Sequence, residues 1–191
     1  TASITCIIFA KFFGHGYLLS GSANGEVKIW QIMTRQCVFT WMPHAFHSIS
    51  QIIETKDVNG EIMIITCSND HTIKRWMLNP QLDNDKIIGA KPKCKTLYLG
   101  HKGAVNCMTL FYDYIVSGCQ NGCLKWWDLY SGRCLKTVTN AHDTITKVGA
   151  CGKKLITAGG DTFVCIWNGS NGQQEHKMLG HATTCMYMLS R

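Results

Sequence analysis

The stretch Ser117–Trp127 reads SGCQNGCLKWW, and Asp128 follows it directly. Asn121-Gly122 lies between two apolar runs, and this dipeptide is a strong signal for a β-hairpin turn because both residues tolerate positive φ. The apolar runs around this turn are Ala104–Leu110, Tyr114–Ser117, Leu124–Trp127 and Cys134–Val138. The runs are short and show no helical period, so the segment predicts four consecutive β-strands.

Three further segments share this plan, with Ser or Thr first, Asn or Asp four positions later and Trp ten positions after the start. They read SGSANGEVKIW (20–30), TCSNDHTIKRW (66–76) and TAGGDTFVCIW (157–167). The four tryptophans, Trp30, Trp76, Trp127 and Trp167, are 46, 51 and 40 residues apart. Four short strands in a repeat of this length are typical of one blade of a β-propeller.

A second motif alternates with the first one. Gly100-His101, Ala141-His142 and Gly180-His181 recur, with histidines 41 and 39 residues apart, and each pair precedes an apolar stretch. The two-part repeat resembles the WD40 family, whose unit carries Gly-His near one end and Trp-Asp near the other. The resemblance implies an all-β fold, a WD40-type β-propeller of four blades plus the first strand of a fifth at Thr183–Leu189. We expect this to be an incomplete arc of a seven-bladed ring.

We expect residues 1–191 to form a single WD40 propeller region. The predicted blades cover about 1–41, 42–99, 100–140 and 141–179, and 180–191 begin the next blade. Two segments lengthen the regular spacing. Glu54–Gly60 extends one hairpin loop, and Asn79–Lys95 is predicted to be a long loop between the third and fourth strands of the second blade.

The resemblance also implies a buried polar network in each blade, in which the histidine bonds the turn Asp and joins a strand Ser or Thr and the Trp. In the third and fourth blades these residues are His101, Ser117, Asn121 and Trp127, and His142, Thr157, Asp161 and Trp167. The second blade offers Thr66, Asp70 and Trp76 with either His44 or His47, and the first offers Ser20, Asn24 and Trp30, its Gly-His lying outside the chain. Asn replaces Asp in two turns, so we expect weaker networks there, since an amide brings no charge.

Recurring His, Ser and Asp also suggest a catalytic triad, but a catalytic site needs one copy and these residues occur once per blade. We therefore predict no catalytic residue and no enzyme activity. No phosphate loop, dinucleotide fingerprint or nucleophile elbow occurs, so no cofactor-binding residue and no small-molecule substrate are expected. No apolar run is long enough to span a membrane.

The eleven cysteines follow the repeat rather than a metal-binding pattern. Cys6, Cys107 and Cys185 share one place in the first strand, and Cys37 and Cys134 share one at the start of the fourth. Equivalent positions in different blades lie far apart, so these residues suit small buried side chains, and no metal site is predicted. Cys119 and Cys123 flank one turn and are close enough in sequence to approach each other. Many unpaired thiols indicate a reducing intracellular compartment, cytoplasm or nucleus.

The resemblance implies a scaffold that binds peptides or domains of other proteins through one propeller face. The residue before each turn Asp or Asn points toward that face in the family, which selects Ala23, Asn69, Gln120 and Gly160. Two alternatives stay open. The chain carries a net charge of +7, and the basic loop 86–102 with Lys91, Lys93 and Lys95 is a candidate for nucleic-acid contact. The chain is also compatible with the substrate-recognition part of a ubiquitin ligase.

Overall fold

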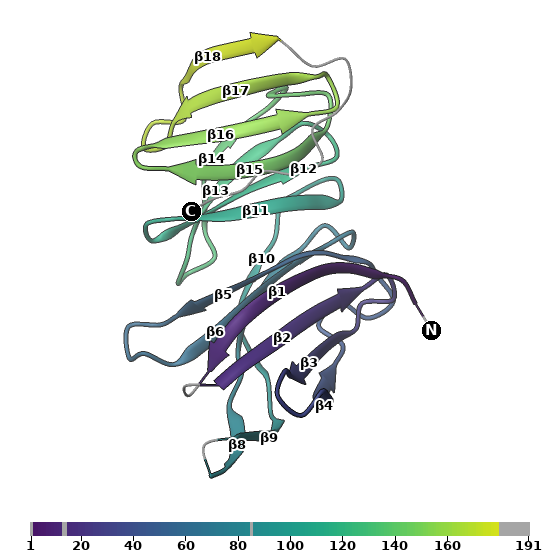
Figure 1. The fold of residues 1–191 in the computed structure, drawn as a ribbon. Coiled ribbons are helices and arrows are strands. Elements are labelled where there is room, and N and C mark those ends of the chain that lie inside the picture. The colour runs from purple at the N-terminus through teal and green to yellow at the C-terminus, as the bar shows by residue number, and fades with distance from the viewer. Residues whose placement is uncertain (1, 13–14, 85, 180–191) are drawn as a thin grey trace. The chain divides into compact units, whose positions relative to one another are not determined.

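A computed structural model describes residues 2–12, 15–84 and 86–179. All regular structure in these ranges is β-strand, and four sheets have four antiparallel strands each (Figure 1). The all-β class predicted from the repeat is confirmed. None of the described residues forms a helix long and apolar enough to cross a membrane. The chain divides into two compact units, Thr1–Leu97 and Tyr98–Arg191. The predicted strand Thr183–Leu189 lies outside the described residues.

The first unit holds two of the sheets. The first sheet has the order β1-β2-β3-β4 and the second the order β10-β7-β6-β5. The strands of the first sheet are β1 (Ile4–Phe12), β2 (His15–Ser22), β3 (Val27–Gln31) and β4 (Gln36–Trp41). Those of the second are β5 (Ile49–Lys56), β6 (Ile62–Ser68), β7 (Ile73–Met77) and β10 (Lys93–Tyr98). Each hairpin joins neighbouring strands, as the short turns between the apolar runs require.

The second unit repeats this plan, with the orders β11-β12-β13-β14 and β15-β16-β17-β18. The strands are β11 (Val105–Phe111), β12 (Tyr114–Cys119), β13 (Leu124–Asp128), β14 (Cys134–Val138), β15 (Ile145–Cys151), β16 (Lys154–Gly159), β17 (Phe163–Asn168) and β18 (Gln174–Leu179). The irregularities repeat as well. In the sheets that begin with β1, β11 and β15, the register shifts immediately before the tryptophan of the third strand. The repeat therefore encodes the bulges of these three sheets together with their strands.

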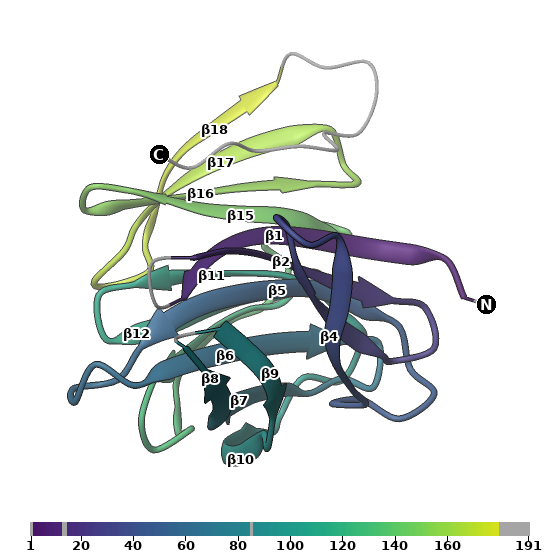
Figure 2. The same ribbon diagram turned by 60° about the horizontal axis from the view of Figure 1, so that its bottom comes forward.

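Segment 79–95 was predicted to be a loop, and that prediction was wrong. The structure contains a two-stranded hairpin there, formed by β8 (Pro80–Asp83) and β9 (Lys86–Ala90). The Ile87 side chain is buried, its N–H donates to the Tyr17 hydroxyl at 2.9 Å, and β9 lies beside β4 (Figure 2). The apolar residues of the segment are buried by a sheet that is distant in sequence, so its own pattern did not reveal the hairpin.

Each unit has its own hydrophobic core. In the first unit the buried cluster includes Tyr17, Leu19 and Ile64, and every residue of β6 is buried. In the second unit the cluster includes Phe111, Leu155 and Trp126. Alternation of apolar and polar residues places the outward side chains of β3 and β13 at intermediate exposure, as period-two strands require.

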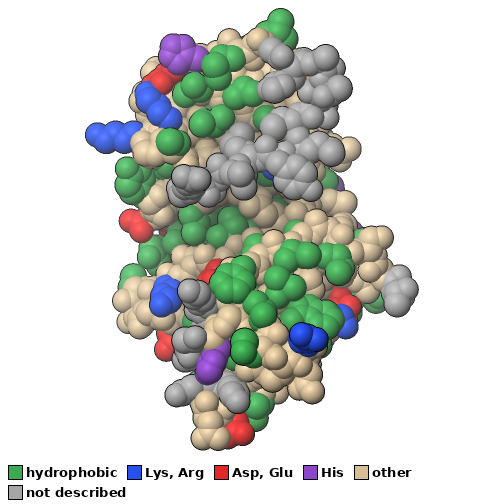
Figure 3. Space-filling model, viewed as in Figure 1, with side chains coloured by type: hydrophobic (Ala, Val, Ile, Leu, Met, Phe, Trp, Pro, Cys, Tyr) green, Lys and Arg blue, Asp and Glu red, His purple; other side chains and the backbone are tan. Residues whose placement is uncertain are grey.

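The edge strand β1 carries exposed apolar side chains. Ile4, Ile7 and Phe9 are all more than half exposed, and Figure 3 shows hydrophobic side chains over this part of the first unit. At the far edge of the second unit, β18 is exposed along its whole length. Both are strands with one unpaired edge in their sheets.

Candidate functional site

A buried chain of hydrogen bonds links three side chains to Asp161 in the sheet of β15–β18. His142 Nδ1 lies 2.7 Å from Asp161 Oδ1, and His142 Nε2 lies 2.7 Å from Thr157 Oγ1. The Trp167 indole N–H donates to the same hydroxyl at 2.8 Å. If the Thr157 hydroxyl donates to Nε2, the Nδ1–H of a neutral imidazole donates to the carboxylate. Every polar group of these four side chains then has a partner. The hydrogen-bond network therefore connects the loop before β15 to the β16–β17 turn.

The second sheet contains the same arrangement with His44. His44 is fully buried, with Nδ1 2.7 Å from Asp70 Oδ2 and Nε2 2.8 Å from Thr66 Oγ1, and the Trp76 indole donates to Thr66 at 3.1 Å. His47 is exposed, and its Nδ1 lies 2.9 Å from the carbonyl of Ala45. The sequence did not decide whether His44 or His47 belongs to this hydrogen-bond network. In the structure it is His44 that contacts Asp70 and Thr66.

Asp70 is the titratable group most affected by these contacts. Burial raises its pKa, but the hydrogen bonds from His44 and Thr72 outweigh burial and hold the pKa well below its usual range. The Asp70 Oδ1 atom accepts the Thr72 N–H at 2.9 Å and the Thr72 hydroxyl at 2.7 Å. Asp70 is therefore a structural anion that holds its own turn.

In the third sheet the histidine and the Asn of the turn have different contacts. His101 Nε2 lies 2.6 Å from Ser117 Oγ, and the Trp127 indole donates to that oxygen at 2.8 Å. Asn121 Nδ2 donates instead to the Lys102 carbonyl at 3.5 Å, a long bond. The Asn substitution therefore gives the turn a contact with the preceding backbone.

The first sheet has a cavity beside the hydroxyl group of Ser20. The Trp30 indole donates to Ser20 Oγ at 2.9 Å, and Asn24 Oδ1 accepts a bond from the Ser22 hydroxyl. A cavity of about 230 Å³ opens beside Ser20 and Trp30 and is also lined by Lys28. In the other three sheets a histidine ring contacts the equivalent hydroxyl.

The four candidate partner-face residues share one backbone contact. The backbone N–H of each donates to a carbonyl that lies just before the first strand of its own sheet. These bonds are Ala23 to Ser3 (2.9 Å), Asn69 to Ser48 (3.0 Å), Gln120 to Ala104 (2.8 Å) and Gly160 to Thr144 (2.8 Å). All four residues are exposed. We call these residues and the turns that carry them the turn face.

Two glycines of these turns pack closely against the next blade. In the turns of the first and third sheets, Gly25 and Gly122 have φ of 86° and 67°. A Cβ atom at either position would lie 1.7 Å from a histidine carbonyl oxygen of the next blade, that of His44 or His142. Of the Asn-Gly pairs, only the glycines have positive φ. Glycine is therefore required at these two positions by close packing as well as by backbone conformation.

The basic segment 86–102 presents lysine side chains to solvent. Lys91, Lys93 and Lys95 are all exposed, and Lys93 and Lys95 lie on β10, an edge strand of its sheet.

The cysteines of the described ranges are all free thiols, Cys119 and Cys123 included. In the same ranges no group of three or more His, Cys, Asp or Glu side chains is placed to hold a metal ion.

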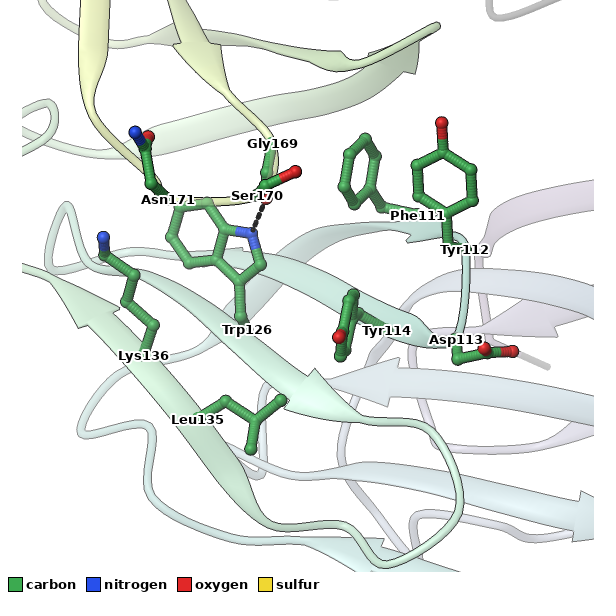
Figure 4. Close-up of a pocket in the computed structure, with 10 residues that line it drawn as sticks. All are labelled: Phe111, Tyr112, Asp113, Tyr114, Trp126, Leu135, Lys136, Gly169, Ser170 and Asn171. Carbon is green, nitrogen blue, oxygen red and sulfur yellow. Dashed lines mark hydrogen bonds between the residues drawn. The ribbon is translucent and has the colours of Figure 1, made fainter.

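A further site contains residues that the sequence analysis did not select. A pocket of about 460 Å³ in the second unit is lined by Phe111, Tyr112, Asp113, Tyr114, Trp126, Leu135, Lys136, Gly169, Ser170 and Asn171 (Figure 4). We call it the aromatic pocket. Its sequence signal is the run Phe-Tyr-Asp-Tyr at the β11–β12 turn, because a tight hairpin turn has no structural need for three aromatic side chains.

Comparison with known proteins agrees with this geometry. The family model described as "WD domain, G-beta repeat" matches residues 1–31, 92–128 and 132–168, so the chain belongs to the WD40 repeat family. The four-stranded sheets are thus WD40-type propeller blades.

Individual relatives are distant and longer. The chain is 23% identical to the nuclear distribution protein nudF of Aspergillus niger over 94% of this chain and 38% of that protein. It is 29% identical to the nuclear distribution protein PAC1-1 of Uncinocarpus reesii, again over 94% and 38%. It is 25% identical to the CCR4-associated factor 4 homolog of Candida glabrata, over 90% and 33%. The chain thus spans little more than a third of these relatives.

Among solved structures, the computationally designed protein Ika8 superposes with a TM-score of 0.74 at 23% identity. The alignment covers 99% of this chain and 53% of the designed protein. This likeness concerns the fold alone.

Proposed function

We propose that the chain is part of a non-catalytic WD40 scaffold that binds peptides or protein domains through the turn face. One observation carries this proposal. Ala23, Asn69, Gln120 and Gly160 are exposed, and the same backbone hydrogen bond holds each of them at the same place in its blade. Exposed residues on a rigidly held backbone lose little entropy when a partner binds, which favours recognition. Membership of the WD40 family supports a role in protein interaction.

The buried networks support the non-catalytic part of the proposal. The hydroxyls of Thr66, Ser117 and Thr157 lie on fully buried residues, and each already accepts a tryptophan N–H. A nucleophile has to reach its substrate, and these oxygens have no exposed surface. We infer that the His, Ser or Thr, and Asp sets hold the turns of the scaffold in place.

We further propose that the four sheets are consecutive blades of one propeller region and that the protein works in a reducing intracellular compartment. Free thiols at all cysteines of the described residues support the second statement. The relatives named above are nuclear distribution proteins and a CCR4-associated factor homolog, but each is longer than this chain. We propose only that the partner of the scaffold is another protein.

The experiment introduces positive charge on the turn face of the full-length protein. Asn69→Arg and Gln120→Arg replace exposed turn residues, and Asn59→Arg is the control, since Asn59 is exposed in the β5–β6 loop at the other end of the strands. Partners recovered by quantitative affinity purification should fall at least fivefold for the double variant and stay unchanged for the control. Equal recovery of every partner from all three proteins, with equal melting temperatures, would rule out the turn face.

A second candidate concerns the basic segment. Lys93 and Lys95 are two residues apart on edge strand β10, so both extend to the same side of the strand. This spacing suits phosphate contacts of a nucleic acid. If the segment binds RNA or DNA, affinity should fall steeply with salt and with substitution of Lys91, Lys93 and Lys95 by Gln. Affinity that is insensitive to both would remove this candidate.

A further inference from the structure

The aromatic pocket lies at the other end of the strands from the turn face. The β11–β12 turn, which carries Tyr112 and Asp113, precedes β12, whereas Gln120 follows β12. The remaining wall comes from the β17–β18 turn of the neighbouring sheet, with Gly169, Ser170 and Asn171 (Figure 4). The pocket is therefore a separate surface, built by two adjacent blades of the second unit.

Two residues of this pocket, Tyr114 and Trp126, have no Phe, Tyr or Trp counterpart in the other blades, whereas the first blade carries Phe12-Phe13 at its equivalent hairpin. Trp126 precedes the repeat tryptophan, and the equivalent residues in the other blades are Ile29, Arg75 and Ile166. The β11–β12 hairpin reads Phe-Tyr-Asp-Tyr, whereas the equivalent β15–β16 hairpin reads Cys-Gly-Lys-Lys over residues 151–154. Since the fourth blade folds without aromatic residues at this turn, the blade architecture does not require them.

Tyr112 adopts an unfavourable backbone conformation at this turn. Its φ is 52°, in the left-handed region, and Gly152 occupies the equivalent position of the fourth blade with φ of 56°. A bulky residue is rarely found there, and the strain costs about 1 kcal/mol. The Tyr112 side chain is 68% exposed, so burial of the ring does not offset this cost. Strain held at an exposed side chain is characteristic of binding sites.

The floor of the pocket is rigid. Trp126 is 4% exposed, and its indole N–H donates to the Gly169 carbonyl at 3.0 Å (Figure 4). A Cβ atom on Gly169 would lie 2.1 Å from the Phe111 ring, so the neighbouring turn closes directly onto that ring. The Phe111 and Tyr112 rings meet edge to face, with centroids 4.8 Å apart. The aromatic surfaces are thus held in place without a ligand.

The two ends of the pocket carry opposite charges. Asp113 is exposed beside the tyrosines, and no ion pair to it is present within the part of the chain that the structure describes. Lys136 extends from β14 toward the other end, where its ammonium nitrogen lies 3.0 Å from the place of a Cβ on Gly172. Figure 4 shows Trp126 and Tyr114 between Asp113 and Lys136. An unpaired carboxylate next to aromatic faces favours a cation.

We propose that the aromatic pocket binds an arginine side chain of a partner peptide, with an acidic residue of that peptide facing Lys136. A guanidinium stacks on aromatic rings and also donates paired hydrogen bonds to a carboxylate, here that of Asp113. Lys136 repels a second cation and Asp113 repels phosphate groups, so neither a polybasic peptide nor a nucleic acid fits the whole pocket. This site does not depend on the turn face.

The test uses the full-length protein and the peptide acetyl-Gly-Arg-Ser-Glu-Gly-amide in titrations followed by NMR. Saturable shifts should appear at the Trp126 indole. The same peptide with citrulline in place of arginine keeps the shape and removes the charge, and it should bind at least fivefold more weakly. Asp113→Asn should weaken binding of the arginine peptide about tenfold, because it removes a charge-assisted hydrogen bond. Lys153→Gln changes the equivalent position of the β15–β16 turn and should leave binding unchanged.

Tyr112→Gly separates binding from stability. It relieves the backbone strain, so its melting temperature should equal or exceed that of the parent while its affinity falls about fivefold. The proposal is overturned by equal binding of the arginine and citrulline peptides, by unchanged affinity in Asp113→Asn, or by the absence of saturable binding. Tighter binding of a trimethyl-lysine peptide also overturns it, since that cation donates no hydrogen bond to Asp113. Gln120→Arg on the turn face should leave the affinity for the arginine peptide unchanged. This variant therefore distinguishes failure of the aromatic-pocket proposal from failure of the turn-face proposal.

Discussion

The Nδ1 atom of His44 lies 2.7 Å from Oδ2 of Asp70, although 26 residues separate them in the chain. His44 belongs to the loop before β5, and Asp70 belongs to the turn between β6 and β7. The bond therefore connects the two loops at one end of the blade, and Thr66 and Trp76 extend it into the core. His142 and Asp161 repeat the same contact in the fourth blade at 2.7 Å.

His44→Ala should destabilise the protein by about 3 kcal/mol, because it leaves a cavity at a fully buried position and removes a hydrogen-bond partner from Thr66 and from the Oδ2 atom of Asp70. His47→Ala is the matched control, since His47 is exposed and only three residues away, and it should change stability by less than about 0.5 kcal/mol. Urea unfolding of both variants measures these differences. Similar losses in the two variants would mean that the buried hydrogen bonds do not hold the blade.

Asp70→Asn should change how stability depends on pH. The folded state holds the pKa of Asp70 below its usual range, so the ionised carboxylate stabilises the fold above the unfolded pKa of about 3.9. This contribution is lost as the pH falls below that value toward the folded pKa. The difference in unfolding free energy between the parent and Asp70→Asn should thus be largest near neutral pH and shrink below about pH 4.

Asp143→Asn serves as the control for this pH series. Asp143 is exposed, so the difference between the parent and this variant should stay near zero throughout. A gap between the parent and Asp70→Asn that is constant from pH 7 to pH 3 would contradict the role given to the Asp70 carboxylate.

Gly122→Ala and Gly152→Ala separate steric contact from backbone strain. Both glycines have positive φ, 67° and 56°. A Cβ at Gly122 would lie 1.7 Å from the His142 carbonyl oxygen, whereas a Cβ at Gly152 meets no atom within 4 Å. Gly152→Ala should cost about 1 kcal/mol from strain alone, and Gly122→Ala should cost more than twice as much. Equal melting temperatures for the two variants would argue against tight packing of the third turn on the next blade.

Thiol labelling should distinguish the cysteines by burial. Burial raises the pKa of the Cys107 thiol to about 12, so almost no thiolate is present at neutral pH. Cys37 and Cys151 are exposed. Iodoacetamide should modify these two thiols in the native protein and reach Cys107 only after denaturation, as mass spectrometry of the labelled peptides can show. Rapid native labelling of Cys107 would mean that β11 opens readily.

Local patterns predicted much of the fold. Cys134–Val138 was predicted as a strand and coincides with β14, and Leu124–Trp127 lies within β13. Such strands are visible in sequence because alternation and turn residues are properties of contiguous segments. The β8–β9 hairpin was missed, since Ile87 is buried by contacts with β4 and Tyr17, far away in the chain.

By itself the sequence determined the all-β class, the four-stranded blade and the family, because the residues that specify each turn and strand of the repeat are neighbours in the chain. Only the tertiary structure decided that His44 rather than His47 contacts Asp70, since both histidines precede the same strand and differ in burial. Only the tertiary structure brought Trp126 against Gly169, 43 residues later, to form the aromatic pocket. Contacts between blades depend on how sheets stack, and no local pattern encodes that geometry.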